Sequence, residues 1–523
     1  MVPRTLEIMT DLAPLEIHCR LPTSLVPITA ILFLHRRLVK STAKAACFCV
    51  FQNVYFYRNM KYLLVAILLT SVLISCKKES FITSGSASLY TSADTLHFDT
   101  VFTTTGSTTR FFRIYNDNNQ KLRLSKVSLR GGSTSFFDIN VDGTPGPEVT
   151  DIEMDANDSI YVFVTVKIDP SAANLPYVVQ DSILIDFNGN ERWVQLEAWG
   201  QNANFMRSRI ITGNVTWTNN RPYVITGGLL VDENATLTIE KGCRIYLHAD
   251  APLLVDGTLK VTGEKYDSTR VVFKGDRLDD PYRDFPGGWP GIYFSETSKD
   301  NTLQYANVLN AYQGIVAEKP SVNSNPKVLL SECVVDNCYD AGILGVQSAI
   351  KAQNCLVSNC GKNILLGYGG TYDFSQCTVA SYSNSYILHK DPVLVVTNYV
   401  KDGNTILTAN CTASFRNCIF WGENGTAEDE VVTDKQGSSM FNVSFQYCLW
   451  KAKNEPGNVT ATKIIRNQSP LFDSVNTQLK LYNFRLRAES PAINWGTNTG
   501  VTIDLDGQQR NVGAPDLGCY EKH

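Results

Sequence analysis

Residues 330–379 read LSECVVDNCYDAGILGVQSAIKAQNCLVSNCGKNILLGYGGTYDFSQCTV. Within this stretch, Cys333, Cys355 and Cys377 follow one another at intervals of 22 residues. A valine lies two residues after each of these cysteines and therefore keeps the same interval. Self-similarity at a fixed period of this size is typical of a solenoid, in which each repeat stacks on the one before it. The stretch therefore predicts an architecture and assigns no reaction.

The repeat continues on both sides of this stretch. Residues 303–312 align with residues 330–339 at a constant offset of 27, and the extra residues predict an outward loop near 319–327. Downstream, residues 415–420 and 445–450 repeat the order apolar-x-x-Cys-x-apolar. The intervals between the last cysteines of the series, 41 and 30 residues, require outward loops or an intervening coil.

The same kind of unit occurs upstream, in residues 229–242 and 253–263. Each piece contains a short apolar strand, a tight turn, a second short strand and a glycine, and Leu237 and Leu259 are again 22 residues apart. Short strands at one coil per 22–24 residues predict a parallel β-helix, in which each strand pairs with the equivalent strand of the next coil.

This pattern resembles the right-handed parallel β-helix family, which has the pectin-lyase-like fold, over residues 210–523. The segments SPAINWG (490–496), DLDGQQR (504–510) and PDLGCYE (515–521) resemble the closing segment of a subset of bacterial β-helix proteins. The resemblance implies a polysaccharide lyase, a polysaccharide hydrolase or a non-catalytic surface protein. The hydrolases of the family carry an aspartate pair followed by Gly-His-Gly, and this sequence lacks that motif.

The ten cysteines after Cys76 invite a disulfide interpretation in an exported protein. The register favours buried free thiols instead, because equivalent side chains in coils about 4.8 Å apart run parallel and do not reach the S–S dihedral easily. Asn310, Asn337 and Asn359 also share one register. We expect them to form an asparagine ladder at a turn, with side-chain amides satisfying backbone groups.

Residues 89–205 predict a separate all-β domain. Residues 159–169 read SIYVFVTVKID, in which apolar and more polar residues alternate as in a half-buried strand. Residues 182–187 and 193–199 are two further strands that flank Asn188-Gly189, a strong hairpin signal. Several short strands in this length fit an antiparallel β-sandwich. The stretch resembles the immunoglobulin-like domains of bacterial envelope lipoproteins, which implies a spacer or docking unit and carries no catalytic residue.

Residues 60–75 are predicted to be a lipoprotein signal peptide. Lys61 supplies a positive charge, residues 62–74 are almost wholly apolar, and Ser75 precedes Cys76. The ending LISC resembles the lipobox of bacterial lipoproteins, in which the cysteine is acylated and becomes the mature N-terminus. The alternative is an ordinary signal or anchor helix followed by a chance cysteine. Residues 76–88 would then be a short tether.

Because signal peptides occupy true N-termini, we interpret residues 1–59 as a mis-called upstream extension; a genuine extended leader is the alternative. A mature chain starting at Cys76 carries 39 basic and 48 acidic side chains, a formal charge of −9. This balance argues against a nucleic-acid partner. The expected location is the bacterial cell envelope, as an outer-membrane lipoprotein held by its lipid anchor.

The stretch GDRLDDPYRDFPGGW (275–289) is the main candidate site. Its acidic residues would supply the oxygen ligands that Ca²⁺ prefers, its arginines would meet a uronate carboxylate, and its aromatic residues would stack on a sugar face. The alternative is a surface loop whose tryptophan packs on the solenoid. The candidate ligand-binding residues are Arg277, Asp279, Asp280, Tyr282, Arg283, Asp284 and Trp289, with Asp276 as a further carboxylate for the weakly supported Ca²⁺.

Two weaker clusters have structural alternatives. Asp504, Asp506 and Asp516 resemble part of a calcium loop, but a turn that closes the solenoid is the favoured interpretation. His389 lies in a polar loop and is more simply an ordinary loop histidine. Without a C-x-x-C pair, a zinc site has almost no support.

Together, these features predict an all-β protein with an N-terminal β-sandwich (89–205) and a right-handed parallel β-helix (206–523). The expected function is binding of a glycan or protein ligand at the cell surface, without catalytic residues or a resident metal. The alternative is a polysaccharide lyase or glycoside hydrolase acting on a uronic-acid-containing polysaccharide.

Overall fold

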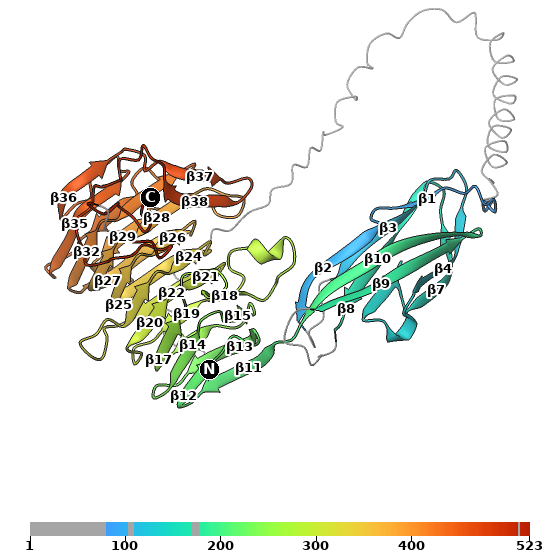
Figure 1. The fold of residues 1–523 in the computed structure, drawn as a ribbon, viewed down its shortest axis with the longest axis horizontal. Helices are drawn as coiled ribbons and strands as arrows, with labels where there is room; N and C mark the ends of the chain where they lie inside the picture. Colours follow the sequence, from blue (N-terminus) through green and yellow to red (C-terminus); the bar gives the residue numbers. More distant parts are fainter. Residues whose placement is uncertain (1–79, 103–108, 169–176, 511–512) are drawn as a thin grey trace, which may run out of the picture.

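The computed structural model describes residues 80–102, 109–168, 177–510 and 513–523. These residues form a β-sandwich followed by a large solenoid (Figure 1). The predicted signal peptide, Cys76 and residues 1–59 lie outside the described residues. None of the helices in the described ranges has the length and apolar character that a membrane crossing needs.

The sandwich has two five-stranded sheets, with strand orders β1-β3-β8-β5-β6 and β2-β10-β9-β4-β7. All pairs are antiparallel except β2 with β10, which pair in parallel. The strands are β1 (Leu89–Thr91), β2 (Thr95–Phe102), β3 (Arg110–Asn116), β4 (Leu122–Leu129), β5 (Phe137–Val141), β6 (Thr144–Pro145), β7 (Glu148–Met154), β8 (Asp158–Val166), β9 (Tyr177–Phe187) and β10 (Asn190–Gln201), with a 3₁₀ turn η2 (Gly132–Thr134).

Strand alternation places the sandwich core where the sequence predicts it. In β8, Ile160, Val162 and Val164 are buried, while the intervening residues face outward. Asn188 and Gly189 connect β9 to β10 with φ angles of 47° and 77°. Two consecutive positive φ angles define the hairpin turn that matches the twist of the flanking strands, so the predicted hairpin is confirmed.

The sandwich extends into the segment predicted to be a tether. The Ile82 amide donates to the Lys121 carbonyl at 2.8 Å, and Ala87 is buried in the sandwich core. At the other end, β10 stops at Gln201 and β11 starts at Asn204, so the solenoid sheet begins two residues before the predicted boundary at 206.

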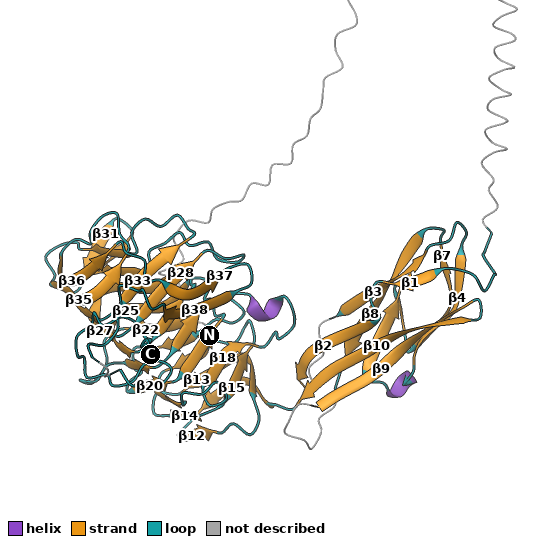
Figure 2. Cartoon of the chain, turned by 45° about the horizontal axis from the view of Figure 1, so that its top comes forward, coloured by secondary structure: helices purple, strands orange, loops and turns teal. Residues whose placement is uncertain are grey.

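The solenoid strands follow one another around successive coils (Figures 1 and 2). They are β11 (Asn204–Ile211), β12 (Asn214–Trp217), β13 (Tyr223–Val231), β14 (Thr236–Glu240), β15 (Arg244–Leu247), β16 (Leu253–Val255), β17 (Thr258–Thr262), β18 (Val271–Gly275), β19 (Ile292–Phe294), β20 (Asn301–Gln304), β21 (Ala306–Leu309), β22 (Gln313–Glu318), β23 (Val328–Ser331), β24 (Val334–Asp336), β25 (Ala341–Gln353), β26 (Leu356–Ser358), β27 (Lys362–Ser375), β28 (Thr378–Tyr382), β29 (Leu394–Thr397), β32 (Cys411–Arg416), β33 (Ile419–Glu423), β34 (Val431–Asp434), β35 (Phe441–Trp450) and β36 (Val459–Arg466).

These strands form three parallel stacks along the solenoid. The first stack contains β15, β18, β21, β24, β26, β28 and β33; the second contains β16, β19, β22, β29 and β34; the third contains β14, β17, β20, β23 and β32. The longer strands β13, β25 and β27 bend through two stacks, as do β11, β35 and β36. The corner where the chain passes from the first stack to the second is called the first corner below.

The observed registers match those predicted from the intervals. Leu237 pairs with Leu259, and Leu303 pairs with Leu330. Phe415 pairs with Phe374 before it and with Phe445 after it, so the intervals of 41 and 30 residues come from outward loops and no coil intervenes. The loop after β29 contains the antiparallel hairpin β30 (Tyr399–Asp402) and β31 (Thr405–Thr408).

The repeated cysteines form an inward ladder. Every cysteine in the described ranges is buried and free, which confirms the thiol interpretation over disulfides. The ladder thiols each donate a hydrogen bond to the carbonyl two residues earlier, at 3.2 to 3.5 Å, in Cys333, Cys355, Cys377, Cys418 and Cys448. Burial raises the pKa well above its usual range in Cys333, Cys355, Cys377 and Cys418, which keeps these thiols protonated.

Residues 467–523, called the closing segment here, pack on the outer face of the first stack. Their only regular elements within the described residues are β37 (Phe472–Asn476) and β38 (Leu481–Leu486), which pair in an antiparallel hairpin. Phe484, Leu505 and Leu517 form one buried cluster with Ala380 and Ile419 of the first stack. The closing segment therefore buries an apolar sheet face that the coils alone would leave in water.

Candidate functional site

The main candidate site is an outward loop at the first corner. β18 ends at Gly275 and β19 begins at Ile292, so residues 276–291 leave the coil; we call them the crossing loop. The loop contains the short helix η3 (Tyr282–Asp284), which stands out at the edge of the solenoid and is drawn purple in Figure 2. Its base is held by Asp276, which hydrogen-bonds to His248 Nδ1 at 2.8 Å. Burial raises the pKa of Asp276, and the hydrogen bond to His248 opposes this rise.

The crossing loop runs along the predicted asparagine ladder. The Asn310 side chain donates to the Arg283 carbonyl at 2.8 Å, and the Asn337 side chain donates to the Asp284 carbonyl at 2.9 Å. Asn337 also donates to Asn310 Oδ1 at 2.9 Å, whereas Asn359 donates to Asp336 Oδ1 at 3.1 Å. The ladder prediction is therefore confirmed for the first two members, which hold the loop as well as the coils.

The charged residues of the loop pair among themselves. Arg277 donates from Nε and Nη2 to the two carboxylate oxygens of Asp279 at 2.8 and 3.0 Å. Arg283 lies 2.9 Å from Asp280. Arg277 also covers the Tyr282 ring at 4.0 Å from its centroid. The loop thus brings its predicted polar residues together as ion pairs and does not gather its carboxylates around one point.

The role predicted for Trp289 is wrong. Its side chain is 1% exposed, belongs to the solenoid core, and donates its indole N–H to the Leu309 carbonyl at 2.9 Å. An indole in this position cannot present a face to a sugar ring. The alternative interpretation, in which the tryptophan packs on the solenoid, describes its true position.

Residues from distant parts of the chain complete the loop's surroundings. Lys480, in the turn between β37 and β38, lies 2.9 Å from Asp284 and donates to the Tyr386 hydroxyl at 3.0 Å. The Phe285 ring packs on Tyr386 with centroids 4.9 Å apart. Neither Tyr386 nor Lys480 carries a sequence signal for this position, because both reach the loop only through the tertiary fold.

A second group of side chains lies beside the loop at the first corner. Tyr312 and Tyr339 occupy successive coils, are 47% and 55% exposed, and stack with centroids 5.7 Å apart. Asp340 accepts from Gln313 at 2.8 Å and from Lys362 at 3.1 Å. Gly287 of the loop has a φ of +79°, a conformation that favours glycine, and it lies beside the Tyr339 side chain. In the sequence, Tyr312 and Tyr339 each end one of the aligned repeat motifs, and this shared position was the available signal for the second group.

The crossing loop, Tyr312, Tyr339, Tyr386 and Lys480 together form what we call the corner platform. The platform combines exposed aromatic rings with hydrogen-bonding groups from several coils and from the closing segment. Aromatic side chains with a polar end are well suited to contacts with amphipathic ligands. The arrangement can therefore bind a ligand that presents both apolar ring faces and hydroxyl groups.

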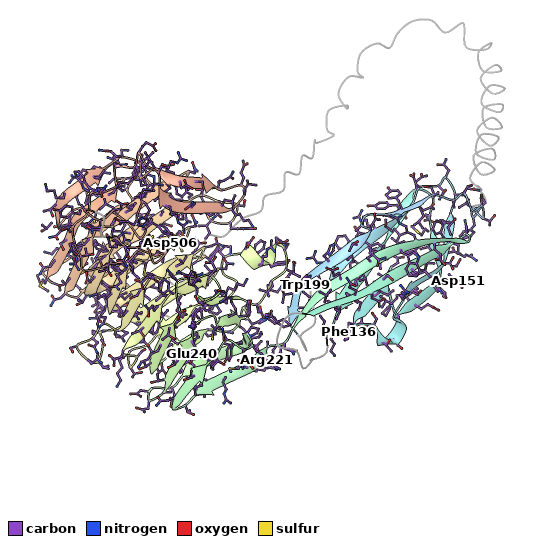
Figure 3. The ribbon with its side chains drawn as sticks, in the orientation of Figure 1. Phe136, Asp151, Trp199, Arg221, Glu240 and Asp506 are labelled. Atoms are coloured by element: carbon purple, nitrogen blue, oxygen red, sulfur yellow. The ribbon has the colours of Figure 1, made fainter. Side chains whose placement is uncertain are left out.

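The acidic residues of the closing segment are structural. Asp504 Oδ1 accepts from the backbone of Asp506 and Gln508, and Asp516 accepts from the backbone of Asn494 and Lys522. Asp506, labelled in Figure 3, pairs with Arg485 at 2.6 and 2.7 Å. These contacts are those of a turn that closes the solenoid, the interpretation favoured from the sequence.

A cavity of about 490 Å³ lies in the closing segment, and Asp473, Asp506 and Glu521 are among its lining residues. Glu521 accepts from the buried Arg510 at 3.1 Å. Burial, assisted by the nearby charge of Asp516, raises the pKa of Glu521 to about 7.

His389 is not an ordinary exposed loop residue. It is 1% exposed and contacts Glu430 at 2.9 Å between its Nε2 and Oε1. A Cβ on Gly422 would clash with both side chains, so glycine provides the room for this pair. Among all described residues, no group of three or more His, Cys, Asp or Glu side chains is arranged to hold a metal ion.

The parallel stacks define the class of the protein, a parallel β-helix solenoid with an N-terminal sandwich. The comparison with protein families agrees: residues 196–379 match the family described as a right handed beta helix region. The match begins in β10 and ends in β28, and the same parallel pairing continues to β36. The fold is therefore a β-sandwich followed by a right-handed parallel β-helix, as predicted.

Three solved structures to which this chain is similar are distant from it in sequence. A family 123 glycoside hydrolase from Clostridium perfringens is 10% identical over 23% of this chain and 26% of its own, with a TM-score of 0.16. A PapD-like domain of human CEP192 is 12% identical over 24% of this chain and 92% of its own, with a TM-score of 0.16. The catalytic domain of a GH87 α-1,3-glucanase in complex with nigerose is 10% identical over 70% of this chain and 87% of its own, also at 0.16.

TM-scores of this size do not establish a shared fold or activity. The comparison with curated proteins found no match. The fold assignment therefore depends on the strand pairings and the family match.

Proposed function

We propose that this protein is an exported, lipid-anchored protein of the bacterial cell envelope whose β-helix binds a glycan or protein ligand without catalysis. Residues 60–75 followed by Cys76 support the export signal and the anchor. The sandwich acts as a spacer between the anchor and the solenoid. A glycan is the ligand that the corner platform fits better.

The exposed tyrosine pair on the corner platform is the observation that carries this proposal. Tyr312 and Tyr339 project from successive coils with about half of each side chain in water. Aromatic residues are enriched at interaction surfaces relative to the rest of a protein surface. The hydrogen-bonding groups of Gln313, Asp340 and Lys362 lie beside them.

The state of the loop carboxylates favours binding over turnover. Asp279, Asp280 and Asp284 each pair with a cation within the platform. A general base needs a free carboxylate within reach of the proton that it removes, and a calcium site needs several convergent oxygen ligands. Asp279, Asp280 and Asp284 supply neither, which supports a ligand-binding role for this part of the loop.

The closing-segment cavity keeps a lyase or hydrolase as the second candidate. Glu521 has its pKa raised to about 7 and lines the cavity together with Asp506. Paired carboxyl groups with different pKa values are the arrangement that glycoside hydrolysis uses. In this second function the polysaccharide would be bound at the closing segment and not at the corner platform.

A polysaccharide-binding assay with a turnover measurement tests the proposal. The full chain in detergent is compared with the variant Tyr312→Ala/Tyr339→Ala and with Tyr266→Ala, a matched control because Tyr266 is 63% exposed and lies at another corner of the solenoid. We expect the double variant to lose about fivefold to a hundredfold in affinity, since each exposed aromatic contact is worth about 0.5–1.5 kcal/mol, and Tyr266→Ala to bind normally.

Three results would contradict parts of the proposal. If the unaltered protein released reducing ends or unsaturated products from a polysaccharide and Glu521→Gln did not, the protein would be an enzyme and the binding-only proposal would be wrong. If all variants bound the polysaccharide with equal affinity, the platform would not contribute to the binding surface. For the anchor, Cys76→Ser should release the protein from the membrane fraction, and continued retention would contradict the lipid attachment.

A further inference from the structure

We infer that the corner platform selects neutral polysaccharides, with the polymer lying parallel to the solenoid axis, and discriminates against uronic-acid polymers. This inference rests on the proposed function, because it names the ligand class of the same platform. It differs from the expectation drawn from the loop sequence, in which the arginines would meet uronate carboxylates. It depends on the ion pairs of the platform, on what would follow if a ligand displaced one of these pairs, and on the arrangement of the two tyrosines.

The cations of the platform are already neutralised by aspartates of this chain. Arg277 is held by both oxygens of Asp279, and Arg283 lies 2.9 Å from Asp280. Lys480 lies 2.9 Å from Asp284. A planar guanidinium that already makes a forked contact with one carboxylate has used the geometry that would recognise a second one.

The same pairing continues beside the tyrosines. Lys362 lies 3.1 Å from Asp340, and Gln313 donates to the other oxygen of that carboxylate at 2.8 Å. This corner therefore offers amide, carboxylate and ammonium groups suited to hydroxyl partners, and the charge of Lys362 is compensated by Asp340. Hydroxyl groups can both donate to the aspartates and accept from the lysine and glutamine.

Displacing one of these pairs would not create an acidic-ligand site. An exposed ion pair is worth only about 0–1 kcal/mol, so a uronate could separate Arg283 from Asp280 at small cost. The displaced aspartate would then remain beside the uronate, because Arg283 lies in η3 and Asp280 lies just before it in the chain. Two carboxylates at close range repel each other, so the exchange gains no net attraction.

The tyrosines set the direction of the ligand. Tyr312 and Tyr339 occupy equivalent positions in successive coils, with ring centroids 5.7 Å apart and planes at 23°. Successive coils stack along the solenoid axis, so these two rings follow one another in that direction. The crossing loop extends the surface the same way, because Phe285 reaches Tyr386 in a later coil. A linear polymer along this axis would contact several coils at once.

Affinity measurements at two salt concentrations test the ligand class. The full chain in detergent is titrated with neutral polymers (a soluble β-glucan, a galactomannan and a xylan) and with polygalacturonate and alginate. We expect the neutral polymers to bind with affinities that change less than about twofold between about 20 mM and about 500 mM salt, because screening acts on charge contacts only.

The variant Asp280→Asn frees Arg283, whereas Asp117→Asn makes the same change of charge on the exposed surface of the sandwich. We expect Asp280→Asn to gain about tenfold in affinity for polygalacturonate at low salt, and Asp117→Asn to gain none. This gain supports the inference because it shows that the aspartate, and not the platform's shape, excludes the acidic polymer.

Each other outcome has its own meaning. Tight, salt-sensitive binding of polygalacturonate by the unaltered protein, without a gain in Asp280→Asn, would overturn the neutral-ligand inference and leave the proposed function standing. Failure to bind any polysaccharide, with or without binding of a protein partner, would overturn the inference together with the glycan form of the proposed function. The two failures are therefore distinguishable.

Discussion

Arg510 is fully buried, and three acidic residues lie around it: Asp504, Asp516 and Glu521. Burial raises the pKa of both Asp516 and Glu521, because one cation does not fully compensate several carboxylates in a poorly solvated site. At Asp516, the backbone N–H groups of Asn494 and Lys522 oppose this rise. Glu521 is therefore the member of the group whose pKa rises furthest, to about 7.

This rise predicts a pH-dependent stability. The folded-state pKa of Glu521 lies above its ordinary value of 4.5, so its contribution is fully present below pH 4.5 and is lost as the pH rises through about 7. We expect the free energy of unfolding to decrease between pH 4.5 and 7, and Glu521→Gln to flatten part of that decrease. Urea denaturation over this pH range measures both.

Glu296→Gln is the control, because Glu296 is exposed in an outward loop of the solenoid. Its pH profile should match that of the unaltered protein. Identical profiles for Glu521→Gln and the unaltered protein would contradict the assigned titration.

At the scale of elements, the crossing loop owes its position to the corner beneath it. Asn310 and Asn337 have φ angles of 60° and 56°, a conformation that asparagine tolerates better than most residues. Their side-chain amides then point along the corner and hold the carbonyls of Arg283 and Asp284. The same residues therefore form the turns of the coils and position the loop.

Asn337→Ala tests this coupling. The substitution removes the bonds to the Asp284 carbonyl and to Asn310 Oδ1, and we expect a loss of about 1–3 kcal/mol in unfolding free energy. We also expect faster proteolytic cleavage within residues 277–287, because the loop loses an attachment. Limited proteolysis and urea denaturation measure these effects.

Asn458→Ala is the matched control, since Asn458 has a φ of 59° and an exposed side chain. This control variant has the same unfavourable backbone conformation for alanine, so it distinguishes the effect of backbone strain from the effect of losing the Asn337 hydrogen bonds. Equal cleavage of the loop in both variants would show that the asparagine ladder does not hold it.

At the scale of the whole molecule, the sandwich and the solenoid have separate hydrophobic cores. Val162 belongs to the first core and Val357 to the second, and the two buried clusters share no residue. Phe102 of β2 also packs on Tyr246 of the solenoid, with centroids 5.0 Å apart, in a small cluster of its own. A contact of this size leaves each core to determine the stability of its own domain.

Two unfolding transitions are therefore expected. Val162→Ala should lower the midpoint of the sandwich transition only, and Val357→Ala should lower that of the solenoid transition only. Each substitution should reduce the unfolding free energy of its own domain by about 1–3 kcal/mol. Differential scanning calorimetry measures both midpoints in one experiment. A shift of both transitions by either variant would show that the domains unfold as one cooperative unit.

The repeat unit and its registers could be predicted because they depend on local periodicity. Cys333, Cys355 and Cys377 recur at one interval, and a strand that repeats its apolar positions must bury them in every coil. The sandwich strands and the hairpin at Asn188-Gly189 follow from the same kind of evidence. The sequence also located the crossing loop, because residues 275–289 break the period with polar and aromatic residues.

The environment of individual side chains could not be predicted in this way. Lys327 ends a stretch that the sequence indicates to be an outward loop, yet its side chain is buried and its Nζ donates to the carbonyls of Ser295, Glu296 and Glu318. Trp289 lies in the core instead of on the candidate surface, and His389 is buried against Glu430. Burial of each side chain depends on neighbouring coils, which local composition does not specify.

The sequence by itself thus determined the solenoid, its inward cysteine ladder and the place where the period breaks, because a fixed hydrophobic repeat permits only one stacking register. Only the tertiary structure decided what the crossing loop touches. Lys480 and Tyr386 are distant in the chain, and they meet Asp284 and Phe285 because the closing segment folds back on the first stack. That long-range packing adds the Lys480–Asp284 pair to the two local ion pairs of the loop, and it leaves the tyrosines of the first corner exposed.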